Sequence, residues 1–168
     1  MPAATQIPVS EYLSTTYRPD REYMDGEIVE RNLGEYEHSR PLARLAGLFG
    51  AREAELDIVV LIGQRVQVTP SRFRIPDVCL LAADAPDEQI ITHPPFLCIE
   101  ILSKDDTVSS TVERLDDFLG MGVPNIWLID PKNRRGYRYT SEGLLEAKDG
   151  VLRSSVEAVA LPLAELFD

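Results

Sequence analysis

The stretch Phe96-Leu97-Cys98-Ile99-Glu100-Ile101-Leu102 is apolar at every position except Glu100. A short, continuous apolar run is typical of a strand that is buried on both faces of a sheet. An unpaired carboxylate in such a strand costs several kcal/mol, so Glu100 needs a cation, a hydrogen-bonding partner or a metal. The stretch therefore predicts a central strand whose acid requires an explanation.

A second acid, Asp77, lies in another apolar run, RIPDVCLL. The 23 positions from Asp77 to Glu100 leave room for a strand, a loop and an antiparallel or neighbouring return strand, which can bring the two side chains together. Two adjacent carboxylates repel each other, and a cation that prefers oxygen ligands, such as Mg²⁺, removes the repulsion. The alternative is that each acid caps a backbone group or pairs with a nearby arginine, such as Arg74 for Asp77.

The rest of the chain predicts further elements around these runs. We expect helices over 10–17 (capped by Ser10), 35–56 and from about Thr107 to Gly120 or Gly122; a hairpin at Asp25-Gly26; strands over 58–68, 73–81, 96–102 and 125–130; and an exposed hairpin of 137–140 with 144–152. This order predicts an α/β (α+β) fold with a mixed β-sheet core flanked by helices. We expect one domain over 1–168, with an N-terminal lead-in at 1–20 and a C-terminal hairpin and tail at 136–168.

Composition excludes several classes of protein. The 168 residues are 44% hydrophobic and 27% charged, as in one globular domain, and the net charge of −11 argues against an unspecific polyanion binder. The sign changes locally, because 40–74 holds six arginines and three acids and a second basic cluster lies at 132–138. Cys79 and Cys98 sit in apolar runs and are expected to be buried and reduced. Without a basic start or a bilayer-length apolar run, we expect a cytoplasmic protein with no membrane contact.

Five short motifs, in order along the chain, resemble those of the bacterial Uma-type restriction endonucleases. They are Asp25-Gly26-Glu27, His38-Ser39, Pro76-Asp77-Val78, Glu100-Ile101-Leu102-Ser103 and the run from Gly122 to Pro131, followed by the closing LPLAELF. The resemblance extends from about Tyr12 to Phe167. That family is placed in the PD-(D/E)XK nuclease superfamily, so the resemblance implies a restriction-endonuclease-like core and metal-dependent cleavage of DNA.

Carried over by position, the resemblance makes Asp77 the acid of the PD half-motif and Glu100 the second metal-binding acid. The backbone carbonyl of Ile101 would add a third oxygen ligand for Mg²⁺, or for Mn²⁺ as a substitute. Glu27 would be a further carboxylate near the site, although an exposed turn acid is the alternative. His38 would contact a phosphate or, alternatively, cap the first long helix or lie on the surface.

The basic residue of the superfamily is where this chain departs from the pattern. The lysine expected two residues after the second acid is Leu102 here, and the lysine that the family supplies from the next helix is replaced by Arg114. Arginine can stabilise a pentavalent phosphate but does not readily relay a proton. Lys104 is a substitute only if the strand bends. Ser110 stands where the family often has an acid.

Three functions therefore compete at this point. The first is a Mg²⁺-dependent endonuclease acting on DNA, in which a dimer would favour cleavage of both strands. The second is a catalytically weak or inactive relative that binds nucleic acid or protein. The third is a protein whose acids form only ion pairs and which binds another protein or itself, through edge strands near Tyr137 and Tyr139.

Overall fold

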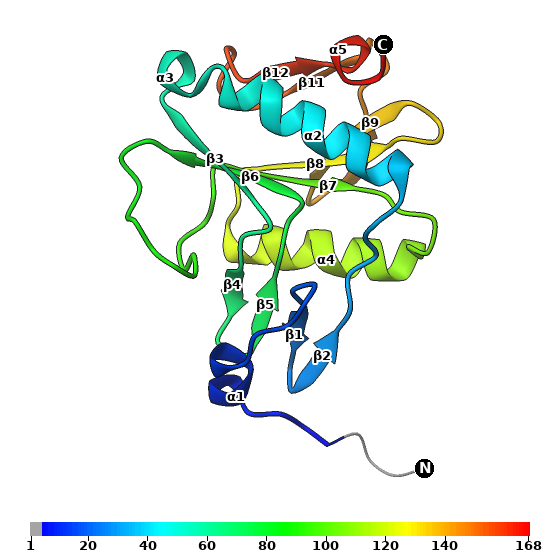
Figure 1. Cartoon of the computed structure of the whole chain (residues 1–168). Helices are drawn as coiled ribbons and strands as arrows, with labels where there is room; N and C mark the ends of the chain where they lie inside the picture. The colour runs from blue at the N-terminus through cyan, green and yellow to red at the C-terminus, as the bar shows by residue number, and fades with distance from the viewer. Residues whose placement is uncertain (1–4) are drawn as a thin grey trace.

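A six-stranded sheet lies at the centre of the molecule, in the strand order β10-β9-β8-β7-β6-β3 (Figure 1). Its strands are β3 (Ile58–Ile62), β6 (Val78–Ala82), β7 (Leu97–Ile101), β8 (Asn125–Asp130), β9 (Arg135–Thr140) and β10 (Gly143–Glu146). Only β7 and β8 pair in parallel, and α4 (Val108–Met121) makes the crossover that parallel neighbours require. The computed structural model describes residues 5–168.

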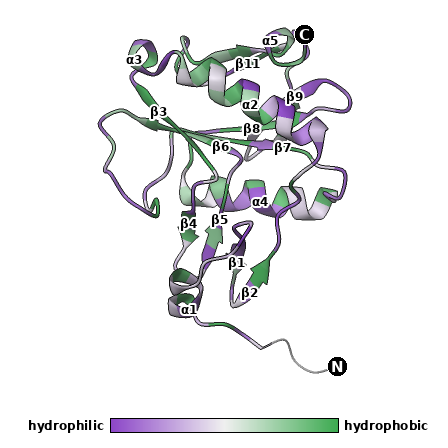
Figure 2. Cartoon of the chain, viewed as in Figure 1, coloured by the Kyte–Doolittle hydropathy of each residue, from purple (hydrophilic) through white to green (hydrophobic). Residues whose placement is uncertain are grey.

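The two faces of this sheet are covered by different helices, α2 (Tyr36–Gly50) and α4 (Figure 1). Leu97, Ile99 and Ile101 pack in one core cluster with side chains of α2. Cys98 packs in the other cluster, with side chains of α4. Because side chains alternate along a strand, Glu100 points to the α4 face. In Figure 2 the central strands are mainly hydrophobic, whereas both helices carry hydrophobic and hydrophilic residues.

A four-stranded sheet, β2-β1-β5-β4, lies on the α4 side of the central sheet (Figure 1). It consists of β1 (Glu22–Met24), β2 (Glu27–Val29), β4 (Val66–Thr69) and β5 (Arg72–Arg74), and α1 (Val9–Ser14) packs against it. The contact is aromatic: Tyr12 is fully buried, with its ring centroid 5.1 Å from that of Tyr23 and 5.3 Å from that of Phe73. This sheet carries Glu22 and Arg74 towards α4.

The remaining elements are short. They are α3 (Glu53–Leu56), β11 (Val151–Arg153), β12 (Ala160–Pro162) and α5 (Leu163–Phe167). Leu152, Leu161 and Leu166 join the core cluster on the α2 side. Across 5–168 there is no helix with the length and apolar character needed to cross a membrane.

The structure confirms the predicted mixed sheet flanked by helices, the hairpin at Asp25-Gly26 and the strand around Glu100. It also confirms the helix after Thr107, which caps α4 through a capping box with Ser110. Gly122, at φ 98°, ends this helix. Cys79 and Cys98 are buried and free, as expected.

Two predicted strands are wrong in their extent, because each divides between the two sheets. The run 58–68 separates into β3 and β4 at Gly63, whose φ of 62° favours glycine. The run 73–81 separates into β5 and β6 around Pro76, which has no N–H for a sheet ladder. Gly63 and Pro76 interrupt the two runs in the sequence, but a single glycine or proline can equally mark a bulge within one strand, so neither indicates a second sheet.

Some predicted boundaries are corrected as well. The first helix spans Val9–Ser14 with Pro8 as its N-cap, not Ser10, and the helix expected over 35–56 ends at Gly50 before the separate turn α3. The C-terminal hairpin is β9 with β10 only, since β11 pairs with β12. Tyr137 and Tyr139 lie on β9, which is flanked by two strands, so the edge strand is β10.

Candidate active site

Asp77 and Glu100 meet at adjacent ends of β6 and β7. The antiparallel register places Val78 opposite Ile99 and Cys79 opposite Cys98, and one further step places Asp77 beside Glu100. The Asp77 carboxylate accepts a hydrogen bond from the Ile101 backbone N–H at 2.8 Å. The predicted return strand therefore brings the two acids together, as the sequence indicated.

Asp77 is 5% exposed and is surrounded by groups that favour its charged form. Burial alone would raise the pKa of this carboxyl group, but the His38 side chain, the Ile101 amide and Arg31 together lower it. His38 Nε2 lies 3.2 Å from Oδ1, and Arg31 Nη2 lies 3.5 Å from the same oxygen. Asp77 is therefore a well-held carboxylate. The alternative of an arginine partner and a capped backbone N–H is therefore also met at Asp77, but the arginine is Arg31 and not Arg74, which contacts Glu22 and Asp117.

Glu100 is equally buried, at 3% exposure, but much less well satisfied. Burial raises the pKa of this carboxyl group well above its usual value, and the Arg114 charge opposes that shift only in part. Arg114 Nη1 lies 3.6 Å from Oε2, and Oε1 has no hydrogen-bonding partner among the described residues. A buried carboxylate oxygen without a protein partner is unusual, so Oε1 is open to a cation or a water molecule.

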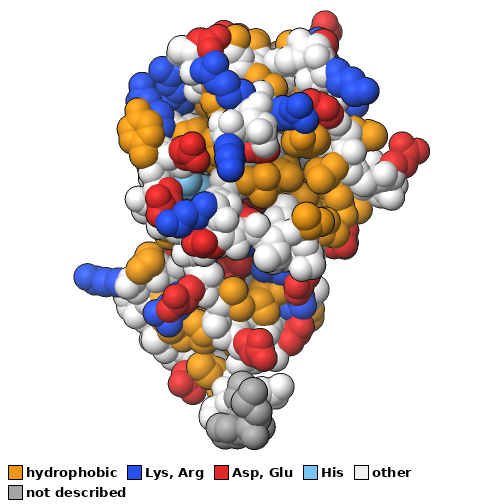
Figure 3. All heavy atoms as spheres, turned by 90° about the vertical axis from the view of Figure 1, so that its right-hand side faces the viewer, with side chains coloured by type: hydrophobic (Ala, Val, Ile, Leu, Met, Phe, Trp, Pro, Cys, Tyr) orange, Lys and Arg blue, Asp and Glu red, His pale blue; other side chains and the backbone are white. Residues whose placement is uncertain are grey.

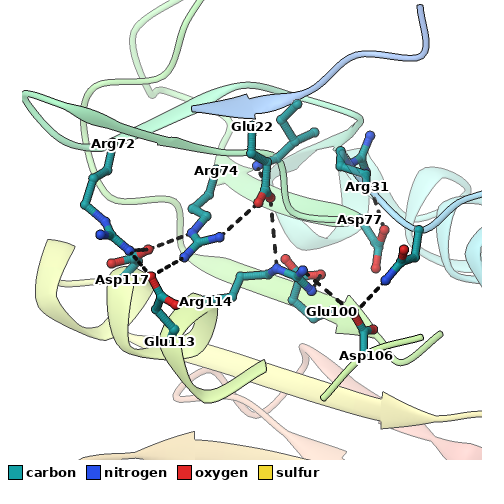
Figure 4. Close-up of polar contacts among 12 residues, drawn as sticks. Glu22, Arg31, Arg72, Arg74, Asp77, Glu100, Asp106, Glu113, Arg114 and Asp117 are labelled. Atoms are coloured by element: carbon teal, nitrogen blue, oxygen red, sulfur yellow. Dashed lines mark hydrogen bonds and ion pairs between the residues drawn. The ribbon is translucent and has the colours of Figure 1, made fainter. Parts of the chain in front are cut away.

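Arg114 reaches the acids from α4, and the four-stranded sheet closes the site from the opposite side (Figure 4). Glu22 comes from β1, and Asp106 comes from the segment between β7 and α4. Around these groups lies a small cavity. Its lining consists of Glu22, Arg31, Asn32, Leu33, His38, Ile75, Asp77, Glu100, Ile101, Ser103, Asp106 and Arg114. We call His38 and the acids and arginines of this lining the cavity cluster: Glu22, Arg31, His38, Asp77, Glu100, Asp106 and Arg114.

The residues at the cavity fit a small hard cation. The room inside is about 20 Å³, enough for about one water molecule or an ion of similar size. Carboxylate and carbonyl oxygens are the ligands that Mg²⁺ prefers, and Glu100 has an oxygen without a partner. Among residues 5–168, no three acids, histidines or cysteines are arranged as a ready-made metal site. A cation would therefore depend on Asp77, Glu100 and main-chain oxygen.

The structure places the other predicted residues at different distances from this cavity. Ile101 and Arg114 line it. Lys104 does not; its ammonium group is 2.9 Å from the Glu35 carboxylate, and its side chain is 64% exposed. Glu27 is exposed on β2, so the Asp25-Gly26 hairpin brings Glu22 rather than Glu27 to the cavity. Ser110 serves the capping box of α4.

Three charged residues at the cavity were not anticipated from the sequence: Glu22, Arg31 and Asp106. Glu22 and Arg31 flank the predicted hairpin, and Asp106 precedes the predicted helix, in stretches where charged residues are ordinary. The sequence held a weak signal for Glu22, because the two residues that follow it, Tyr23 and Met24, are apolar, and all three are buried in β1. His38 was anticipated, and it is buried against Asp77 rather than exposed.

The arginines of the basic segment 40–74 are mostly neutralised. Arg52, Arg65, Arg72 and Arg74 each form ion pairs with acids. In Figure 3, acidic and basic side chains are interspersed over the face shown, without a large patch of one sign. This face therefore offers no broad basic surface to a polyanion.

The overall arrangement is that of the restriction-endonuclease-like fold. The chain superposes on the crystal structure of a putative nuclease belonging to DUF820 from Anabaena variabilis with a TM-score of 0.81, covering 96% of this chain and 97% of that one at 19% identity. A family model described as Uma2, putative restriction endonuclease, matches residues 9–164, and the chain belongs to this family. A search of curated proteins found no significant match.

Proposed function

We propose that the protein is a divalent-metal-dependent endonuclease that hydrolyses phosphodiester bonds in DNA. The observation that carries the proposal is the convergence of two buried carboxylates, Asp77 and Glu100, on a cavity of about ion size, with one Glu100 oxygen left without a partner. Family membership and the fold support a nuclease in general. The metal, the DNA substrate and the residue roles are our inference.

Each residue of the site has a role in this proposal. Asp77 and Glu100, with the carbonyl of Ile101, would hold Mg²⁺ or Mn²⁺. When bound, the cation would polarise the scissile phosphate and lower the pKa of a water molecule. His38 and Arg31 orient Asp77 and favour its charged form. Arg114 supplies positive charge where negative charge develops on the phosphate, but its guanidinium does not accept the proton of the attacking water.

The test is nicking of supercoiled plasmid by purified protein with Mg²⁺, Mn²⁺ or EDTA. We expect metal-dependent nicking that Asp77→Asn and Glu100→Gln each abolish. Asp149→Asn is the matched control, because Asp149 is an exposed acid paired only with nearby groups such as Arg153, and it should cleave like the wild type. Cleavage that persists in EDTA or in both site variants would contradict the proposal.

Metal binding can be measured without any substrate. A ligand present at about a hundred times its Kd stabilises the folded state by about 2.7 kcal/mol, which corresponds to about 5–10 °C in Tm for a chain of this length. We expect such a rise with Mg²⁺ or Mn²⁺ in the wild type and none in Glu100→Gln. Equal rises in both proteins would place the metal elsewhere.

A second candidate function, a binding module without turnover, is favoured by one specific observation. No lysine lines the cavity, and Arg114 is the basic group nearest to Glu100 in the described chain. This alternative predicts salt-dependent binding of DNA with no cleavage under any metal. Cleavage by the wild type decides against it.

A further inference from the structure

The guanidinium of Arg114 is surrounded by three carboxylates from three different parts of the fold. Nη1 lies 3.6 Å from Glu100, Nη2 lies 3.9 Å from Asp106 and Nε lies 4.0 Å from Glu22, so each nitrogen faces a different acid (Figure 4). All three distances exceed those of ordinary hydrogen bonds. Arg114 Nε is buried and has no hydrogen-bonding partner within residues 5–168. The acids thus hold the guanidinium by charge while its N–H donors stay uncommitted.

Two of these acids are themselves held firmly by other groups. Glu22 is 2% exposed; one oxygen accepts the Ile75 N–H at 3.0 Å, and the other accepts from Arg74 at 3.0 Å. Asp106 accepts from the Ser103 N–H at 2.9 Å and from Asn32 at 3.2 Å. Neither carboxylate can turn to form a short hydrogen bond with Arg114 without losing these contacts. Groups other than Arg114 therefore hold the carboxylates of Glu22 and Asp106 in place beside it.

The arrangement of these three carboxylates matches the shape of an arginine side chain at position 114. A guanidinium is planar and presents donors in several fixed directions, whereas a lysine ammonium is a single point charge. Here each of the three carboxylates faces a different nitrogen of the guanidinium.

We propose that Glu22 and Asp106 are positioning residues that hold Arg114 beside Glu100, with free N–H donors that bind an oxygen of the substrate phosphate. The inference rests on the proposed function, because it names the group that contacts the phosphate and the residues that place it. A purely structural ion-pair cluster would have short hydrogen bonds like those of Arg74 with Glu22 and Asp117, at 3.0 and 2.6 Å. Arg114 forms none in the described part of the chain, which indicates donors kept for a ligand.

The first test measures the position of Arg114 directly and requires no activity. In ¹⁵N-labelled protein, the Nε–H signal of Arg114 is identified as the signal lost in Arg114→Lys. We expect Glu22→Gln and Asp106→Asn each to speed exchange of this proton with solvent by about tenfold or more, because a charge that holds the side chain is gone. Glu30→Gln is the matched control, since Glu30 flanks the same hairpin and is exposed in a pair with Arg21. Unchanged exchange in both site variants would overturn the proposal.

The second test asks whether Glu22 acts through Arg114. We expect Glu22→Gln to lower kcat for plasmid nicking by about 10- to 100-fold with little change in KM, because Arg114 acts on charge that develops during the reaction. In an Arg114→Gln background the same change should cost less than about threefold, as is usual for residues that act as one unit. Thermal melts of each variant separate this effect from a loss of folding.

The outcomes distinguish the two proposals. An equal loss of kcat from Glu22→Gln in both backgrounds would overturn the positioning role while leaving the nuclease intact. A wild type that cleaves no DNA with any metal would overturn the proposed function, and the proton-exchange measurement would still decide whether Glu22 and Asp106 position Arg114.

Discussion

Two groups of charged residues lie side by side where α4 faces the four-stranded sheet, and their contacts differ in length. The first, which we call the bracing network, consists of Arg72, Arg74, Asp25, Glu113 and Asp117, and it joins the four-stranded sheet to α4 (Figure 4). Its main contacts are hydrogen-bonded ion pairs of 2.6 to 3.0 Å. Arg114 of the cavity cluster directly follows Glu113 on α4. Its nitrogens nevertheless lie 3.6–4.0 Å from the nearest oxygens of Glu100, Asp106 and Glu22.

The difference separates a structural use of charge from a functional one. Hydrogen-bonded ion pairs satisfy each other, and the bracing network leaves a single buried nitrogen, Arg72 Nε, without a partner. The cavity cluster and its lining leave Glu100 Oε1, Arg114 Nε and Ser103 Oγ unpaired. Unpaired buried polar atoms reduce stability and provide the capacity to bind an ion or a phosphate. The four predictions below test whether the two groups divide stability and activity in this way.

The largest expected effect is on cleavage, from either of the two acids. Glu100→Gln and Asp77→Asn should each lower nicking by about a thousandfold or more, because each removes a ligand charge of the site. Their effects on stability should be opposite. Burial disfavours the charge of Glu100, so Glu100→Gln should raise Tm by about 2–4 °C. Asp77 is stabilised as a carboxylate, so Asp77→Asn should lower Tm. Equal losses of Tm in both variants would contradict the comparison.

The next largest effect is on stability, from the bracing network. Arg74→Met leaves Glu22 buried without its ion-pair partner, and breaking a buried pair on one side costs about 3–5 kcal/mol. Urea denaturation should therefore show a clear loss in the free energy of unfolding. The control is Arg153→Met, which removes an exposed pair and should leave the urea midpoint unchanged. A change in Arg74→Met no larger than in the control would show that the network contributes little.

Most of the fold could be predicted because its signals are local. Continuous apolar runs marked β7 and β8, and the 3.6-residue spacing marked α2 and α4. The division of 58–68 and 73–81 between two sheets could not be predicted, because the single Gly63 and Pro76 that interrupt these runs can also mark a bulge within one strand. What separates them is tertiary: each new strand pairs with a different sheet after Gly63 or Pro76.

From local chemistry the candidate site could be predicted only where a charge conflicts with its surroundings, whereas His38, Ile101 and Arg114 were expected from the resemblance to the Uma-type family. Asp77 and Glu100 interrupt apolar runs, so burial and the need for a partner followed from the sequence. Glu22 and Asp106 lie in polar segments and look like surface acids, although both are buried at the cavity. Their positions depend on how the hairpin and the loop before α4 fold back over the sheet, which no local pattern encodes.

A smaller effect is expected in the pH dependence of stability. The pKa of Glu100 is raised on folding, so the stability linked to its protonated form is present below the ordinary value of about 4.5 and is lost as the pH rises towards the folded pKa. In EDTA, the wild type should lose up to about 1.4 kcal/mol per pH unit over that range relative to Glu100→Gln. Urea denaturation of both proteins at several pH values measures this difference. Parallel pH curves would show that Glu100 is not desolvated as described.

The smallest effect is expected at Lys104, the other basic residue near Glu100 in the sequence. Its side chain is exposed and pairs with Glu35, so Lys104→Gln should change nicking by less than about twofold and leave Tm unchanged. Arg114→Gln, measured beside it, should lower nicking by about a hundredfold. If Lys104→Gln had the larger effect, the loop before α4 would have to rearrange to bring its ammonium group to the acids. The basic role assigned to Arg114, and with it the contrast between a braced and an open charge cluster, would then fail.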